Sequence, residues 1–232
     1  MAGHHGSTGG GGSVAALGVT PVLAVATLSG DTRHASDLMP VMEELLRHEG
    51  WAADSITEVF VSIGPGSFTG LRVGVTIART LGWSVGARIV AVPTLDGLAR
   101  NALSAEPPPP HLAVILDAKR SEVFASAFDL RDGRYARVID ARLADPREFL
   151  SMCPRPIAVL GEGLSHHRRA VEECGAVILD PELWAARAEH VVHLGLELSA
   201  AGRYTEPGEL VPLYIRRPDA EERWEARHGK SA

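Results

Sequence analysis

A glycine-proline turn is the first feature of this sequence that could support chemistry. Gly64-Pro65-Gly66 follows the apolar run "ITEVFVSI", and Ser67 or Thr69 stands where a helix would begin. Glycine permits a tight turn, and a hydroxyl there can cap free N–H groups of the first helical turn. Such a turn can bind phosphate. It is neither a Walker motif nor a dinucleotide fingerprint, because no Gly-Lys-Ser/Thr follows and the glycine spacing differs. A purely structural turn is an equally good interpretation.

The helix that must follow this turn carries small residues at every fourth position: Gly70, Gly74, Ala78 and Gly82. Each glycine weakens a helix by about 1 kcal/mol relative to alanine. Positions four apart form one row on a helix surface, and small residues turn that row into a groove that another element can approach closely. The pattern therefore predicts close packing along the row. The chain's own sheet, its first helix or another protein could fill it.

A second helix is predicted earlier, from about Ser36 to His48. Its apolar residues follow the i, i+3, i+4, i+7 rule, at Leu38, Val41, Met42, Leu45 and Leu46. Met39 widens this stripe, so the helix has more apolar surface than one sheet needs. Together with the row of small residues, this predicts a helix-on-helix protein interface. The alternative is that both helix faces belong to the internal core.

Composition narrows the classes of function. The chain has 232 residues, a formal net charge of -6 and two cysteines, Cys153 and Cys174. An acidic chain of this kind is unsuited to a broad nucleic-acid surface. The cysteines lack the spacing of a disulfide framework or a zinc site, which fits a reducing compartment. No secretory signal or membrane span is predicted, so we expect a cytoplasmic protein.

Two α/β regions are predicted on either side of a proline-rich linker. The run Glu106 to Pro110 contains four consecutive prolines, which cannot continue a helix or a central strand. We therefore expect one lobe at residues 1–105 and another at 106–232. Each region alternates short apolar strands with amphipathic helices, as α/β domains do.

Five segments together resemble the TsaB (YeaZ) family. They are "DTRHASDLMPVMEELL" with "SITEVFVSI", "GPGSFTGLRVGVTIARTL", "ILDAKRSEVFASAF", "VLGEGL" and "LVPLYIRRP". The resemblance implies the actin/Hsp70-like ATPase fold, with two similar α/β lobes of mixed sheet and flanking helices. It also implies a non-catalytic subunit of the machinery that makes N6-threonylcarbamoyladenosine at position 37 of tRNA. The expected partners are the catalytic paralogue TsaD and the ATPase TsaE, with tRNA contacted only through the complex.

In that family the first two helices form the dimer surface. The resemblance therefore places partner contacts on the residues Leu38, Met39, Met42, Leu45, Leu46, Gly70, Leu71, Gly74 and Ala78. Whether the isolated chain also forms homodimers through this surface is left open.

A metal site is not expected. The catalytic paralogue holds a metal through histidines four apart, in a segment that corresponds here to "AVPTLDGLAR", with Thr94, Leu95 and Leu98. His190 and His193 in "EHVVH" lack a third ligand, so we interpret them as polar residues on the solvent side of a helix. No serine has a recognisable base, and no catalytic residue is assigned.

The N-terminus departs from the family pattern. Members open with an apolar strand ending in an acid, whereas Met1 to Gly6 read MAGHHG, so the first strand is expected to be missing. Candidate phosphate loops remain, at Ser7, Thr8, Gly9 and Gly10 and at Gly161 and Gly163. Asp117 resembles a phosphate-loop acid that Lys119 or Arg120 could pair. The missing acid argues against binding of ATP with Mg²⁺. The alternative function is a stand-alone ATP-binding phosphotransferase or ATPase of the same fold.

Overall fold

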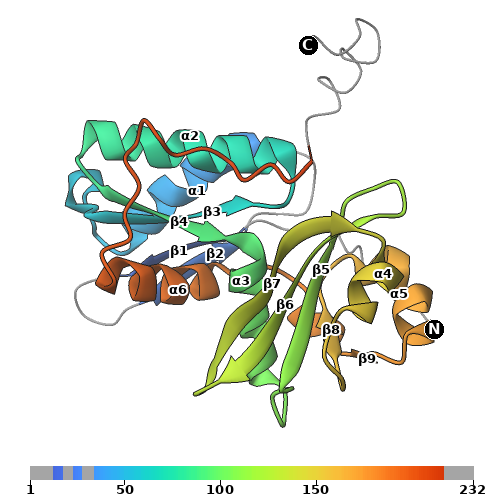
Figure 1. The fold of residues 1–232 in the computed structure, drawn as a ribbon. Coiled ribbons are helices and arrows are strands. Elements are labelled where there is room, and N and C mark those ends of the chain that lie inside the picture. The colour runs from blue at the N-terminus through green and yellow to red at the C-terminus, as the bar shows by residue number, and fades with distance from the viewer. Residues whose placement is uncertain (1–12, 18–22, 28–33, 217–232) are drawn as a thin grey trace, which may run out of the picture.

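The computed structural model describes residues 13–17, 23–27 and 34–216, with side chains from residue 38 (Figure 1). Its elements divide into two lobes. The first lobe is built from β1 (Ser13–Leu17), β2 (Leu23–Thr27), α1 (His34–His48), η1 (Ala53–Ser55), β3 (Glu58–Gly64), α2 (Phe68–Ser84) and β4 (Arg88–Pro93). α3 (Thr94–Ala99) and η2 (Arg100–Ser104) lead into the second lobe.

The second lobe contains a five-stranded mixed sheet. Its elements are β5 (His111–Asp117), β6 (Val123–Arg131), β7 (Arg134–Ala144), α4 (Pro146–Ser151), β8 (Ala158–Leu160), α5 (Leu164–Glu173), β9 (Val177–Ile178) and η3 (Pro181–Leu183). The strand order is β7-β6-β5-β8-β9, with β5 antiparallel to β6 and parallel to β8. The expected mixed sheet with flanking helices is confirmed.

The sheet of the second lobe is buried on both faces. Ala113 and Ile115 of β5 pack with α4 and α5, whereas Leu112 and Val114 pack with α3 and η2. Successive side chains of a strand point to opposite faces, so a strand covered on both sides needs a continuous apolar run. The segment "HLAVIL" provides one, in the central strand β5.

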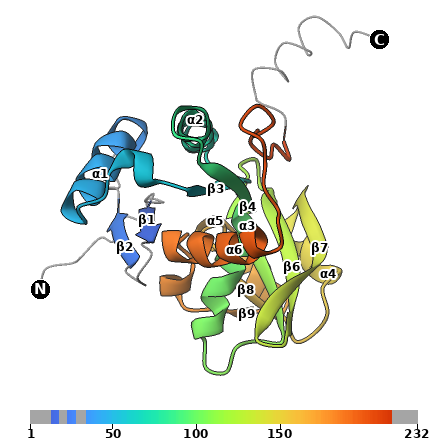
Figure 2. The ribbon, with the colours of Figure 1, turned by 90° about the vertical axis from the view of Figure 1, so that its left-hand side faces the viewer.

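The described strands of the first lobe form two ladders. β1 pairs with β2 in one antiparallel ladder, and β3 pairs with β4 in a separate parallel ladder. α1 and α2 contact these strands from one side and α6 (Ala188–Ala200) from the other (Figures 1 and 2). Among the side chains that the structure describes in this lobe, Val61, Val75, Ala78, Ile89 and Leu210 form one buried cluster.

The chain returns to the first lobe at its end. α6 contacts β1, β3 and β4 although it follows the second sheet in sequence. Residues 204–216, called the C-terminal strap below, then run along α2 (Figure 1). The lobe boundary near residue 105 stays a prediction. The predicted absence of a first strand lies outside the described residues.

Among the described helices, none has both the length and the apolar character that crossing a lipid bilayer requires.

Candidate functional site

The apolar side chains of α1 are only partly covered. Leu38, Met42, Leu45 and Leu46 are all half-buried, and Met39 is 52% exposed. Among the described side chains of this helix, none is fully buried. Helices that belong only to a core bury an apolar stripe. α1 therefore keeps apolar surface available beside α2, which it contacts directly.

The row of small residues on α2 turns inward along the helix. Gly70 is exposed and Gly74 is half-buried. Ala78 is 1% exposed and belongs to the core with Val61 and Ile89. A Cβ atom at Gly82 would lie 2.7 Å from Cγ of Pro207. The chain's own sheet and strap thus fill the second half of the row, and the prediction that Ala78 contacts a partner is wrong for this structure, since its side chain is covered.

What remains is a surface at the first half of α2 and along α1. We call Leu38, Met39, Met42, Leu45, Leu46, Gly70, Leu71 and Gly74 the α1–α2 surface. Its α2 part is open at Gly70, where a Cβ would meet only the Ser67 side chain at 3.6 Å, whereas a Cβ at Gly74 would touch Cγ2 of the core residue Val61 at 3.6 Å. The predicted partner-binding role of these residues stays a prediction.

The turn before α2 is held by hydroxyl groups. The Ser67 side chain accepts a 3.4 Å hydrogen bond from the Gly70 N–H, as the N-cap. The Gly64 N–H donates to the Thr94 hydroxyl at 3.0 Å, and that hydroxyl lies 2.7 Å from the Ser62 hydroxyl. The Thr94 hydroxyl therefore occupies the Gly64 N–H, which is one of the donors that an anion bound at the glycine turn would need. These contacts support the interpretation that the turn has a purely structural role.

The segment that corresponds to the metal-binding helix of the catalytic paralogue is core in this chain. Leu95 and Leu98 of α3 are 0% and 2% exposed, and both pack against the second sheet. Their hydrocarbon side chains offer no metal ligand. Within the described residues, no three His, Cys, Asp or Glu side chains are placed to hold a metal together.

The second glycine loop is packed tightly on β5. Gly161 has φ of +118°, and a Cβ there would lie 2.2 Å from the Ile115 carbonyl oxygen. A Cβ at Gly163 would lie 3.1 Å from the same oxygen. This close approach of two backbones gives both glycines a packing role without any ligand. Ser7, Thr8, Gly9 and Gly10 lie outside the described residues.

Asp117 ends β5 beside this loop. Burial opposes its ionisation, but hydrogen bonds from Lys119 Nζ at 2.8 Å and from the Lys119 N–H at 3.1 Å keep the pKa of Asp117 below its ordinary value. His167 Nε2 lies 3.6 Å from the same carboxylate. The predicted pairing of Asp117 with Lys119 is confirmed. The negative charge of the Asp117 carboxylate is thus already balanced by Lys119.

The two histidines of α6 differ from the sequence interpretation. His193 is exposed, but His190 is half-buried and neither of its ring nitrogens has a hydrogen-bond partner. Burial and the nearby Arg100 lower the pKa of His190. The prediction that both face solvent is therefore wrong for His190. Periodicity missed this because Arg100 comes from η2, far away in sequence.

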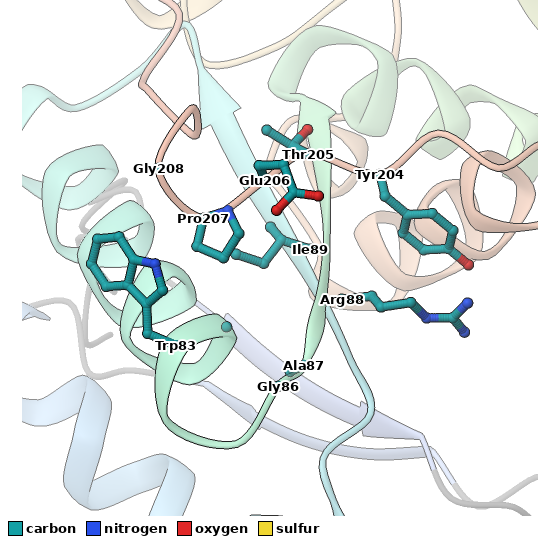
Figure 3. Close-up of a pocket in the computed structure, with 11 residues that line it drawn as sticks. Trp83, Gly86, Ala87, Arg88, Ile89, Tyr204, Thr205, Glu206, Pro207 and Gly208 are labelled. Atoms are coloured by element: carbon teal, nitrogen blue, oxygen red, sulfur yellow. The ribbon is translucent and has the colours of Figure 1, made fainter.

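A pocket of about 490 Å³ lies at the end of α2 (Figure 3). Trp83, Ile89, Glu206 and Pro207 line it, together with Tyr204. Its Arg88 pairs with Glu58 of β3 at 2.6 Å and lies 4.6 Å from the centre of the Tyr204 ring of the strap. We assign this pocket no ligand.

Sequence reasoning missed an aromatic contact between the start of α2 and the C-terminal strap. Phe68 and Tyr214 are 40% and 39% exposed, and their ring centres are 5.4 Å apart. Both residues lie in segments that carry the family resemblance, but spacing alone could not pair positions so distant in sequence.

Comparisons with known proteins agree with this architecture. Residues 18–178 match the family model described as TsaD, tRNA N6-adenosine threonylcarbamoyltransferase. The tRNA threonylcarbamoyladenosine biosynthesis protein TsaB of Bacillus subtilis is 32% identical over 197 residues, which cover 82% of this chain and 83% of that protein. The protein of the same name from Escherichia coli is 25% identical and covers 79% and 80%.

A solved structure has the same fold. YeaZ from Pseudomonas aeruginosa superposes with a TM-score of 0.75 at 24% identity, covering 88% of this chain and 95% of that one. The identity to the Bacillus subtilis protein and the coverage of both chains show that this chain belongs to the TsaB (YeaZ) family.

Proposed function

We propose that this chain is a non-catalytic subunit in the formation of N6-threonylcarbamoyladenosine at position 37 of tRNA, and that it pairs with a TsaD-type catalytic subunit. The relatives reported above are named for biosynthesis of this nucleoside. The observation that carries the pairing is the α1–α2 surface, where partly covered apolar side chains lie beside the open half of the glycine row. A partner helix could settle there at short distance.

A scaffold role fits the residues of α3. Where the resemblance to the catalytic paralogue implies metal-binding histidines, this chain has the core residues Leu95 and Leu98. Replacing metal ligands by buried leucines removes coordination chemistry and adds packing. Catalysis then belongs to the partner, and tRNA is contacted through the complex. We also propose a TsaE-type ATPase as a third component.

The test is co-purification with the TsaD-type subunit of the same organism. Met39→Glu places a charge on an apolar side chain of α1 that is 52% exposed, and we expect it to weaken binding about tenfold or more. Gly70→Leu fills the exposed end of the glycine row and should act in the same direction. Val177→Glu is the matched control, because Val177 is 58% exposed on β9 of the other lobe.

Circular dichroism and thermal unfolding must first show that all three variants are folded. Loss of binding in Met39→Glu and Gly70→Leu but not in Val177→Glu supports the proposal. Wild-type binding by both α1–α2 variants would place the partner elsewhere. Sedimentation of the isolated chain, with and without Met39→Glu, then tells whether a homodimer uses the same surface.

A further inference from the structure

The C-terminal strap is bound to the first lobe along its length. The Thr205 N–H donates to the Ile89 carbonyl oxygen at 2.8 Å, next to the free edge of β4. Leu210 is 1% exposed and packs in the cluster that contains Val61, Val75, Ala78 and Ile89. The Leu213 N–H donates to the Ile63 carbonyl oxygen at 2.7 Å, at the end of β3. The strap is therefore part of the first lobe's structure.

The end of the strap is fixed to the first turn of α2. The Arg72 guanidinium lies 3.9 Å from the centre of the Phe68 ring, and its Nε donates to the Tyr214 hydroxyl at 3.1 Å. The neighbouring turn accommodates the strap backbone only because Gly64 has no side chain: a Cβ there would lie 2.9 Å from the Leu213 carbonyl oxygen. Two segments that carry the family resemblance, "GPGSFTGLR" and "LVPLYIRRP", thus meet in space.

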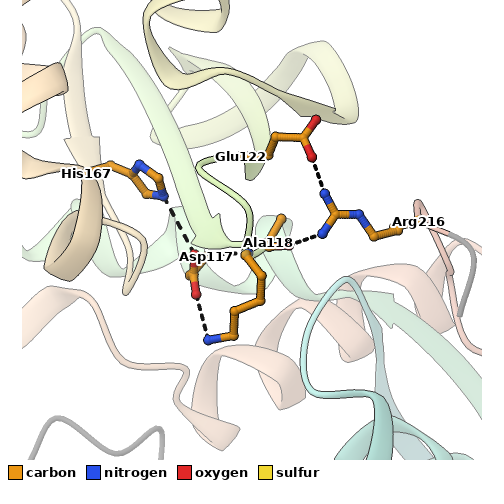
Figure 4. Close-up of polar contacts among 6 residues, drawn as sticks. Asp117, Ala118, Glu122, His167 and Arg216 are labelled. Atoms are coloured by element: carbon orange, nitrogen blue, oxygen red, sulfur yellow. Dashed lines mark hydrogen bonds and ion pairs between the residues drawn. The ribbon is translucent and has the colours of Figure 1, made fainter. Parts of the chain in front are cut away.

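From this anchored position the strap reaches the other lobe. Arg216 donates to the Ala118 carbonyl oxygen and to the Glu122 carboxylate, both in the turn between β5 and β6 (Figure 4). The Arg216 side chain is 13% exposed and that of Glu122 is 37% exposed, so the guanidinium is shielded from water while the carboxylate stays partly solvated. Shielding strengthens a charged hydrogen bond and makes the loss of one partner costly.

The turn that Arg216 holds is an unfavourable one. Lys119, Arg120 and Ser121 have φ of 64°, 54° and 64°, a left-handed conformation that residues other than glycine rarely adopt. Such a backbone persists only where the surroundings impose it. The Ala118 N–H closes the turn by donating to the Glu122 carbonyl oxygen at 3.0 Å. Arg216 binds these same two residues from outside and so clamps both ends of the turn.

We propose that the C-terminal strap is an interlobe latch. Arg216 closes it by clamping the strained β5–β6 turn, and Tyr214 with Arg72 anchors it to α2. The order of the turn and the order of the strap end are therefore coupled, although they lie in different lobes. The turn carries Asp117 and Lys119 at its start, so the latch also sets the position of that ion pair.

Hydrogen exchange of the isolated chain tests the latch without any partner. In Arg216→Ala, we expect exchange to accelerate about tenfold or more at the amides of Ala118, Glu122 and Leu213, with α5 unchanged. Arg203→Ala is the control, because Arg203 is an exposed arginine close to the strap. Acceleration on one side of the interlobe contact only, or wild-type exchange on both sides, would overturn the proposal.

Charge exchange between the two partners provides the second test. Arg216→Glu and Glu122→Arg should each accelerate exchange in both segments, because each places two like charges together. The double variant should recover protection relative to either single variant, since the ion pair is restored in reverse. The carbonyl contact to Ala118 is not restored, so recovery remains partial. Absence of any recovery in a folded double variant would count against a direct Arg216–Glu122 latch.

Discussion

Gly82 and Pro207 are in direct contact across the interface of α2 and the strap: a Cβ atom on Gly82 would lie 2.7 Å from Cγ of Pro207 and 2.9 Å from Cδ1 of Ile89. Alanine at this position gains about 1 kcal/mol of helix propensity. Forcing a methyl group into a filled site costs about 1–3 kcal/mol. Because the proline ring is rigid, we expect the cost to exceed the gain, so that Gly82→Ala lowers the free energy of unfolding by up to about 2 kcal/mol, measured by urea denaturation.

The same substitution two turns earlier should have the opposite sign. At Gly74 a Cβ would meet only Cγ2 of Val61, at an ordinary 3.6 Å. Gly74→Ala should therefore raise the free energy of unfolding by about 0.5–1 kcal/mol, through helix propensity alone. If both variants shift stability in the same direction, the strap does not pack on Gly82 as described.

The glycine row shows what spacing can and cannot predict. Period-four small residues correctly predicted that something packs closely on α2. Spacing carries no information about the element opposite, and Pro207 belongs to a segment remote in sequence. Both the chain's own sheet and another protein were therefore left open. The structure divides the row: the half with Ala78 is internal, and the half with Gly70 is open.

Elements with a clear apolar run or amphipathic period were predicted well, namely α1, β3 and α2. β7 was missed because it is an edge strand whose exposed face carries Arg134, Asp140 and Arg142. Charges protect a free edge from association but hide the strand pattern. α5 was missed because only Leu164, Ala170 and Val171 of its ten residues are buried. Tertiary contacts, and not local pattern, define these two elements.

His190 makes the stability of the folded protein depend on pH. Burial, together with Arg100, Arg187 and His193, lowers the pKa of His190 in the folded state from 6.5, while Glu189 opposes this. The unfolded chain then binds a proton at higher pH than the folded chain. Stability from this residue is present above pH 6.5 and is lost as the pH falls below it. Since the ring is only half-buried, the loss should stay below about 1 kcal/mol.

His190→Leu removes this titration. Neither ring nitrogen has a hydrogen-bond partner, so the substitution breaks no bond. We expect the variant to lose less stability than the wild type between pH 7 and pH 5, measured by urea denaturation at each pH. A proton NMR titration of the wild-type ring should show a midpoint below the ordinary value. Parallel stability curves for the two proteins would contradict the prediction.

Asp96 and Arg137 form an ion pair between α3 and β7. Burial is the main influence on this carboxyl and raises the pKa of Asp96, although Arg137 opposes the shift. Arg137→Met leaves a largely buried acid without its partner and should cost about 1–3 kcal/mol of unfolding free energy. Arg142→Met is the control on the same strand, because Arg142 is exposed and donates only to the Asp140 carbonyl oxygen, at 3.4 Å.

The double variant Asp96→Asn, Arg137→Met distinguishes the effect of the ion pair from the effect of Arg137 packing. If the cost of Arg137→Met comes from the uncompensated carboxylate, neutralising Asp96 should return part of the lost stability, so the two effects will not add. Additive losses would mean that Arg137 acts through the packing of its side chain instead.

The packing role of the second glycine loop leads to the last prediction. Gly161→Ala would bring a methyl group to 2.2 Å from the Ile115 carbonyl oxygen, at a backbone φ of +118°. Backbone atoms of a central strand cannot move aside, so we expect a loss above about 3 kcal/mol, seen as insoluble or molten protein. Gly163→Ala, with its contact at 3.1 Å, should remain folded with a smaller loss in thermal stability.

Gly175→Ala controls for backbone strain alone. Gly175 also has a positive φ, of +66°, but nothing lies within 4 Å of its missing Cβ. Gly175→Ala should lower the free energy of unfolding by only about 1 kcal/mol, the usual cost of the left-handed conformation for alanine. The order of losses therefore distinguishes contact from conformation. If Gly163→Ala were as stable as the wild type but impaired nucleotide binding, the loop would be a phosphate site, and its glycines would serve a ligand instead of the packing of β8 on β5.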